Sequence, residues 1–132
     1  MSGFMRKLSL VAVTSTLTLF LSINSAMAAD AAVEEGKKIY NGAGACSSCH
    51  GPNGEGDGPA GASLEPKPKN FAKGEFGLDT DGDGKKGSET DIFNVITNGA
   101  QKYGGSFMMV GRPDLPEDGR KALAKFILSL QQ

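Results

Sequence analysis

Both cysteines and the single histidine of the chain lie within one short stretch, from Cys46 to His50, in the pattern C-x-x-C-H. Thiol and imidazole groups serve as metal ligands, redox pairs and nucleophiles, so their types alone leave several chemistries open. The spacing restricts the choice, because each of those chemistries needs its own number and arrangement of groups. The stretch therefore predicts one chemical site whose kind must be decided.

Four kinds of site share part of this pattern. A thioredoxin-like pair needs a strand–helix–strand context that the sequence does not show, and a disulfide across so short a ring restrains little of the unfolded chain. A structural zinc site needs four ligands, whereas the chain has no second pair. Covalent haem attachment uses all three side chains: the thiols of Cys46 and Cys49 add to the vinyl groups, and His50 reaches the iron. We therefore interpret the stretch as a c-type haem attachment site.

Three helices are expected to position this site. Residues 30–41 are predicted to be helical with Gly42 at the stop, residues 88–98 open with a capping-box pattern, and a last helix begins at Pro116. Their apolar faces at helical spacing consist of Val33, Ile39 and Tyr40, then Ile92, Phe93, Val95 and Ile96, then Ala122, Leu123, Phe126, Ile127 and Leu130.

The segments between these helices are rich in glycine and proline. Residues 51–71 and 99–114 show no sustained period, and we find no convincing strand. A loop as long as the first is uncommon in a compact domain unless it wraps something. The helices carry too few large apolar residues for a good core, so the chain needs a staple. A haem would supply that core, and the apo chain is expected to be largely unfolded.

The N-terminal segment has the three-part pattern of a secretory signal peptide. A basic start that ends at Lys7 is followed by a mostly apolar run over residues 8–23 and by the small-x-small triplet 26–28. The apolar run is shorter than the ~20 residues that a spanning helix needs, so we expect cleavage after Ala28 rather than a membrane anchor. This predicts a signal peptide at residues 1–28, one domain at residues 29–132 and a periplasmic location.

After residue 28 the attachment motif comes first, then a predicted middle helix, and then a predicted last helix. The three stretches are CSSCHGPNGEGDGPAGASLEPKPKNF, DIFNVITNG and SFMMVGRPDLPEDGRKALAKFILSL. In this order the chain resembles the class I monohaem c-type cytochromes over nearly its whole length. The resemblance implies an all-α fold of three to five short helices wrapped around one covalently bound haem, with long glycine- and proline-rich loops.

The resemblance also implies roles for residues outside the motif. The carbonyl of Pro68 is expected to accept a hydrogen bond from the second ring nitrogen of His50, with Pro66 as the rival because the loop length does not decide between them. A close contact is expected between the first and last helices, made by Gly36, Tyr40 and Phe126.

The sixth iron ligand follows from elimination. A second histidine ligand is impossible within one chain, and the predicted signal peptide holds three of the five methionines, Met1, Met5 and Met27. The remaining candidates are Met108 and Met109, in the region where the family keeps its ligand. The family usually has proline after this methionine, whereas this chain does not. Counting from the last helix favours Met109, which we take as the ligand, and counting from the preceding glycine favours Met108, its rival.

A second pattern resembles the start of a calcium loop. Asp79, Asp81 and Asp83 occupy its first, third and fifth positions, and a glycine follows at the sixth. The closing glutamate would fall at Thr90, whereas Glu89 stands one place early. A polar insertion loop is the favoured interpretation, and calcium at the three aspartates is a secondary hypothesis.

These observations predict an electron carrier rather than an enzyme, because both axial positions of the iron are expected to be filled. The alternative is an open-site haem protein, catalytic or gas-binding, or the haem subunit of a larger oxidoreductase. The balance of 14 basic and 15 acidic residues argues against nucleic-acid binding. We expect a monomer, without a membrane span after cleavage, that meets a redox donor and an acceptor protein.

Overall fold

The computed structural model of the chain describes residues 14–132 and divides into two units, one that ends at Ala31 and a second, Ala32–Gln132. The basic start of the predicted signal peptide, with Met1 and Met5, lies outside the described residues. Helix α1 runs from Thr14 to Asn41. Among residues 14–132, none of the helices combines the length and the apolarity needed to cross a bilayer.

The first helix ends where the sequence predicted but begins earlier. Its last residue is Asn41, and Gly42 follows in a turn. The expected start at Asp30 is wrong for the full-length chain, because α1 is continuous through this residue. The sequence from Thr14 to Ala29 contains neither glycine nor proline, so no residue there interrupts a helix.

The attachment motif lies on a tight turn that is bonded to the end of α1. The amide of Gly44 donates to the Ile39 carbonyl at 2.7 Å, and the amide of Cys46 donates to the Tyr40 carbonyl at 3.0 Å. The short helix α2, Ser47–His50, begins directly after this turn. The last turn of α1 therefore fixes where the motif begins.

Helix α3, Glu89–Asn98, forms as the sequence predicted. Ser88 is its N-cap and completes a capping box with Asp91, in which each side chain bonds the other residue's backbone amide. Ile92 and Ile96 are buried, while the other two predicted apolar positions, Phe93 and Val95, are partly buried. A short 3-10 helix, η1 (Gln101–Tyr103), follows within a segment predicted as loop.

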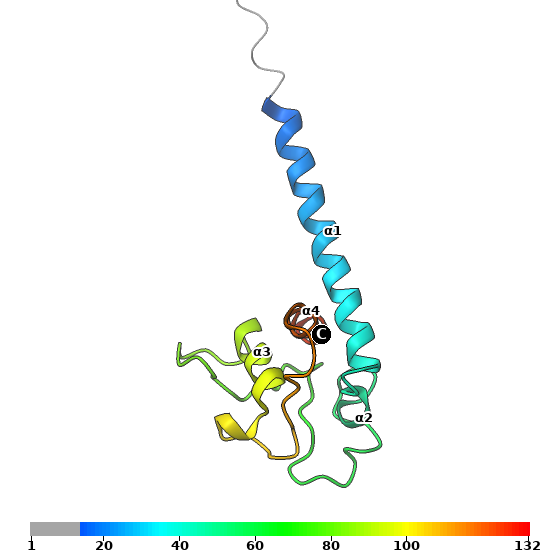
Figure 1. The fold of residues 1–132 in the computed structure, drawn as a ribbon, viewed down its shortest axis with the longest axis vertical. Coiled ribbons are helices and arrows are strands. Elements are labelled where there is room, and N and C mark those ends of the chain that lie inside the picture. Colours follow the sequence, from blue (N-terminus) through cyan, green and yellow to red (C-terminus); the bar gives the residue numbers. More distant parts are fainter. Residues whose placement is uncertain (1–13) are drawn as a thin grey trace, which may run out of the picture. The chain divides into compact units, whose positions relative to one another are not determined.

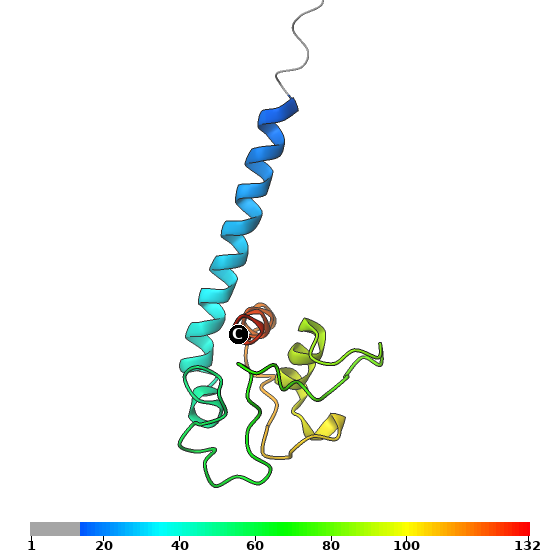
Figure 2. The same ribbon diagram turned by 180° about the vertical axis from the view of Figure 1, so that it is seen from behind.

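Helix α4, Glu117–Ser129, closes the second unit and packs on both α1 and α3 (Figures 1 and 2). The ring of Tyr40 meets that of Phe126 edge to face at 5.2 Å. A Cβ on Gly36 would lie 2.7 Å from the Cβ of Phe126, so only glycine permits this approach of the two helices. The predicted contact between the first and last helices is thereby confirmed.

The second unit is helical throughout its regular structure, and residues 14–132 contain no strand. This confirms the predicted small all-α fold. The buried apolar side chains are few, and the largest of those that are fully buried are Tyr40 and Leu123, at 0% and 1% exposure. Long irregular segments lie between α2 and α3 and between η1 and α4, as the glycine and proline content predicted.

Candidate functional site

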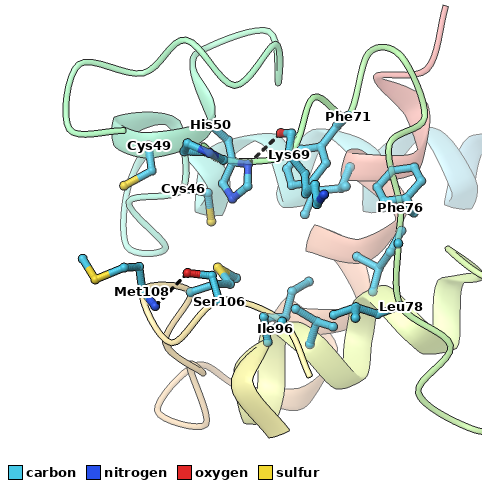
Figure 3. Close-up of a pocket in the computed structure, with 18 of the residues that line it drawn as sticks. Cys46, Cys49, His50, Lys69, Phe71, Phe76, Leu78, Ile96, Ser106 and Met108 are labelled. Carbon is cyan, nitrogen blue, oxygen red and sulfur yellow. Dashed lines mark hydrogen bonds between the residues drawn. The ribbon is translucent and has the colours of Figure 1, made fainter. Parts of the chain in front are cut away.

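The three side chains of the attachment motif lie on one wall of a cavity. Cys46 and Cys49 are unpaired and partly buried, and His50 is buried. The His50 Nδ1 lies 3.0 Å from the carbonyl oxygen of Lys69. Since a carbonyl can only accept, Nδ1 carries the proton and the lone pair is on Nε2. Figure 3 shows this ring and the Cys46 sulfur directed into the same gap.

The acceptor of the His50 hydrogen bond is one residue further along than predicted. Neither Pro68 nor Pro66 makes this contact, because Lys69 does. The Pro68 carbonyl points instead toward Gly56, where a Cβ would lie 2.6 Å from its oxygen. Because the backbone turns the Pro68 carbonyl toward Gly56, the carbonyl of the next residue, Lys69, faces the imidazole.

The imidazole is also packed against an aromatic ring. The rings of His50 and Phe71 are stacked, with centroids 4.3 Å apart and planes inclined by 19°, and Phe76 stacks on the far side of Phe71 at 5.5 Å. Burial lowers the pKa of His50 below its ordinary value, although the hydrogen bond to Lys69 acts in the opposite direction. The neutral ring favoured by burial is the form that binds a metal ion.

The thiol of Cys46 is held in its neutral form. Burial raises its pKa to about 11, and the positive charge of Arg112 offsets only part of that effect. A structural zinc site needs four ligands, and within the described residues the cluster of potential metal ligands is that of Asp79, Asp81 and Asp91, not one around Cys46.

The cavity has a volume of about 850 Å³, within the range of ~300–1,000 Å³ typical of ligand and cofactor sites. Opposite the attachment motif lies the segment that contains Ser106 and Met108 (Figure 3). Apolar side chains such as Leu78, Ile92 and Ile96 form much of the remaining lining. These residues fit a large, flat and mostly apolar group that is bonded on one wall and covered by the other.

Both candidate methionines line this cavity, but they differ in exposure and in backbone anchoring. The Met108 side chain is 47% exposed, whereas Met109 is partly buried. The Met109 carbonyl accepts from the Ala100 amide at 3.0 Å, and its amide donates to the Ser106 carbonyl at 3.3 Å. The position of Met109 is therefore tied to the end of α3 by its backbone.

In the acidic loop around Asp79, the carboxylates that come together are not the three predicted. Ligand oxygens of Asp79, Asp81 and Asp91 lie within 4.8 Å of one another, whereas Asp83 is not part of this group. The carboxylate of Asp79 accepts from the amides of Gly82 and Gly84 at 2.7 and 2.9 Å. The loop is thus closed by its own hydrogen bonds, and the carboxylates that could hold a cation are not the three that the sequence predicted.

Asp91 is a buried carboxylate that sequence reasoning did not single out beyond its place in the capping pattern. It is 1% exposed and accepts four hydrogen bonds, from the amides and hydroxyls of Thr80 and Ser88, at 2.6 to 2.9 Å. Burial alone would raise its pKa, but these bonds outweigh burial and lower the pKa to about 2. Asp91 therefore fastens the acidic loop to the start of α3.

Sequence reasoning also missed Lys69, Phe76 and Arg112 at the cavity. Lys69 contributes its carbonyl to the bond with His50, and no side-chain pattern can reveal such a contact. Phe76 stands in a segment without a helical period. Arg112 lies between two predicted elements, and its one sequence signal is the aspartate two residues later, with which it forms a salt bridge at 2.8 Å.

The helices, the attachment motif and the apolar cavity together define a c-type haem protein. A family model for cytochrome c matches residues 33–131, and the chain belongs to the cytochrome c family. Membership implies covalently bound haem c and supports haem-based electron transfer. A comparison with curated proteins found no match.

Among solved structures, a chain of the reducing HAO-like protein complex of Kuenenia stuttgartiensis is similar to this protein. The two are 31% identical, with a TM-score of 0.59, and the match covers 76% of this chain and 44% of the other. This protein thus corresponds to less than half of its structural neighbour.

Proposed function

We propose that the protein is a monohaem electron carrier. Cys46 and Cys49 form the thioether bonds, His50 is the proximal iron ligand and Met109 is the distal ligand. When bound, the haem supplies one-electron exchange between Fe(III) and Fe(II). The observation that carries the proposal is the cavity itself, with the attachment motif on one wall and the methionine segment on the other.

The proximal side supports this assignment through the hydrogen bond of His50. The His50 Nδ1 donates to the Lys69 carbonyl oxygen, 3.0 Å away, and the stacked ring of Phe71 restricts rotation of the imidazole. Such contacts fix the tautomer and the orientation of a ligating histidine and increase its basicity. His50 would therefore offer its Nε2 lone pair to the iron from a fixed ring position.

Support for Met109 over Met108 comes from burial and from the backbone. A ligand must stay inside the cavity, and Met109 is less exposed and is anchored to Ala100. Met108, at 47% exposure, then covers the cavity rim as a flexible apolar side chain, a role that methionine often fills. If His50 and Met109 both held the iron, no position would remain there for a substrate, and this favours a carrier over an enzyme.

A second candidate function is that of a haem subunit within a larger oxidoreductase. Two observations favour it: the similarity to a chain of the reducing HAO-like complex, and the 68% exposure of both Phe107 and Val110 near the cavity. A lone carrier would keep such side chains in water, whereas a subunit could bury them against a partner. The expectation of a monomer that meets separate donor and acceptor proteins applies to the electron carrier, not to the subunit.

The export proposal rests on the sequence pattern. Residues 1–28 would be removed as a signal peptide and residues 29–132 would form the mature domain in the periplasm. The family match begins at residue 33, and the described helices include none that could span a bilayer. N-terminal sequencing of protein exported by a bacterial host tests this directly, and a mature protein that begins anywhere other than Ala29 contradicts the assigned cleavage site.

The haem assignment is tested by mass spectrometry after maturation in a host that attaches haem c. We expect one haem on the peptide that contains Cys46 and Cys49, retained after acid–acetone extraction. We also expect the ferrous protein not to bind CO, because the distal methionine occupies the iron. Free thiols would contradict covalent attachment, and ready CO binding would favour the open-site alternative over the carrier.

A further inference from the structure

The segment that bears Met109 is held against the C-terminal end of α3 at two points. The Met109 carbonyl accepts from the Ala100 amide at 3.0 Å, and the Arg112 amide donates to the Ile96 carbonyl at 2.7 Å. Between them, a Cβ on Gly111 would lie 2.6 Å from the Thr97 carbonyl oxygen, so the two backbones are in direct contact. One edge of the segment is therefore fixed.

The side chain of Arg112 reaches from this segment to the opposite wall of the cavity. One terminal nitrogen donates to the Gly44 carbonyl at 2.9 Å, across 68 residues of sequence. The Nε and the other terminal nitrogen bind the two carboxylate oxygens of Asp114 at 2.9 and 2.8 Å. A planar guanidinium held in this bidentate manner has its remaining donors aimed in a fixed direction.

The acceptor of this bond belongs to the turn that carries the haem attachment motif. Gly44 is two residues before Cys46, and both line the cavity together with Arg112. The Gly44 amide is itself bonded to the Ile39 carbonyl at 2.7 Å, which ties the turn to the end of α1. The guanidinium thus connects a fixed point on the proximal wall with the methionine segment on the distal wall.

We propose that Arg112 is a positioning residue that latches the Met109 segment onto the Cys46 turn and so keeps the distal ligand at the iron. The inference rests on the proposed methionine ligation. If Met109 held the iron, an external ligand could bind there only after the Met109 segment had moved away. The Arg112–Gly44 bond opposes this opening because it would break when the two walls separate, and Asp114 holds the guanidinium in position for it.

The test is a titration of the ferric holoprotein with imidazole, which binds only after the distal ligand has left. We expect Arg112→Leu to raise the affinity for imidazole about tenfold or more, where tenfold corresponds to about 1.4 kcal/mol. Arg112→Lys keeps the charge but loses the bidentate fork, and it should give a smaller rise. Asp114→Asn should also give a rise of a few-fold, since Arg112 is then less well oriented.

A matched control is Glu117→Gln, which breaks an exposed ion pair with Lys121 (2.7 Å) on α4 and should leave imidazole affinity unchanged. A second measurement does not involve the iron: amide hydrogen exchange at Ala100 and at residue 112 should accelerate in Arg112→Leu but not in the control. Both amides are donors in the bonds that hold the segment to α3.

The outcomes separate the latch from the ligation on which it rests. Wild-type protein that already binds imidazole and CO readily would overturn both. Wild-type protein that resists both ligands, with Arg112→Lys and Asp114→Asn unchanged in affinity and in exchange, would overturn the latch and leave methionine ligation intact. These two variants decide the matter even if Arg112→Leu does not fold.

Discussion

The buried carboxylate of Asp91 predicts a specific dependence of stability on acid. Its pKa falls from 3.8 to about 2 in the folded chain, and each pKa unit corresponds to about 1.36 kcal/mol. The folded state should therefore gain about 2 kcal/mol from this carboxylate at neutral pH. Because the folded pKa is depressed, the gain is complete above about pH 4 and is lost as the pH falls toward 2.

The perturbation is Asp91→Asn, assayed by chemical denaturation of the holoprotein between pH 7 and pH 2. An amide nitrogen cannot accept the bonds that Ser88 donates to one carboxylate oxygen at 2.8 and 2.9 Å. The variant should be less stable by about 2 kcal/mol or more at pH 7, and the gap should shrink toward pH 2. Asp83→Asn, in the exposed part of the same loop, is the control and should change little.

The difference in stability between wild type and variant separates the effect of Asp91 from that of other groups that titrate in acid, including His50. A difference in unfolding free energy that stays constant from pH 7 to pH 2 would show that folding does not lower the pKa of this carboxyl group. A gap below about 0.5 kcal/mol at pH 7 would show that water replaces the four hydrogen bonds at little cost. Either result would refute the reasoning from burial and hydrogen bonding.

Two further predictions concern the distal ligand and the helix contact. Met109→Ala should let the ferrous protein bind CO and should lower the reduction potential as the thioether is lost, whereas Met108→Ala should leave the iron six-coordinate. Visible spectra and voltammetry distinguish these outcomes. The reverse pattern would assign the ligand to Met108. Gly36→Val should lower the stability of the holoprotein in thermal unfolding by about 1–3 kcal/mol or more, because a Cβ there meets the backbone of α4. Gly77→Ala, at a position with no atom within 4 Å of a new Cβ, is the control, and equal effects of the two substitutions would contradict the close-packing argument.

The helices were predictable where local signals mark their ends. The S-E-T-D pattern before α3 produced the capping box that was expected, and the helix ends at Asn98 as predicted. The start of α1 was not predictable in the same way, because Asp30 is a good N-cap only if the residues before it are removed. The helix η1 escaped notice because three residues are too few to show a period.

The site was predictable from side chains and less so from backbone contacts. The motif at Cys46, Cys49 and His50 and the methionine pair were found because their residue types are rare in this chain. The acceptor of the His50 hydrogen bond was predicted at Pro68, whereas it is the carbonyl of Lys69. Every residue has a carbonyl, and only the conformation of the loop decides which one faces the imidazole. The Arg112–Gly44 bond joins segments that are 68 residues apart, and a single sequence contains no signal for such a pairing.

The attachment motif and the Met109 segment line the same cavity but lie far apart in the sequence. The attachment motif at residues 46–50 leaves the ribosome long before the segment around Met109, and the latter is placed by contacts with α3 and the Cys46 turn. A chain interrupted anywhere between these two regions would still present both thiols and His50. Such a fragment could acquire a haem and would leave one side of its iron open to any small ligand. If haem attachment requires only Cys46, Cys49 and His50, a haem on the chain would not by itself show that the second wall of the cavity has formed.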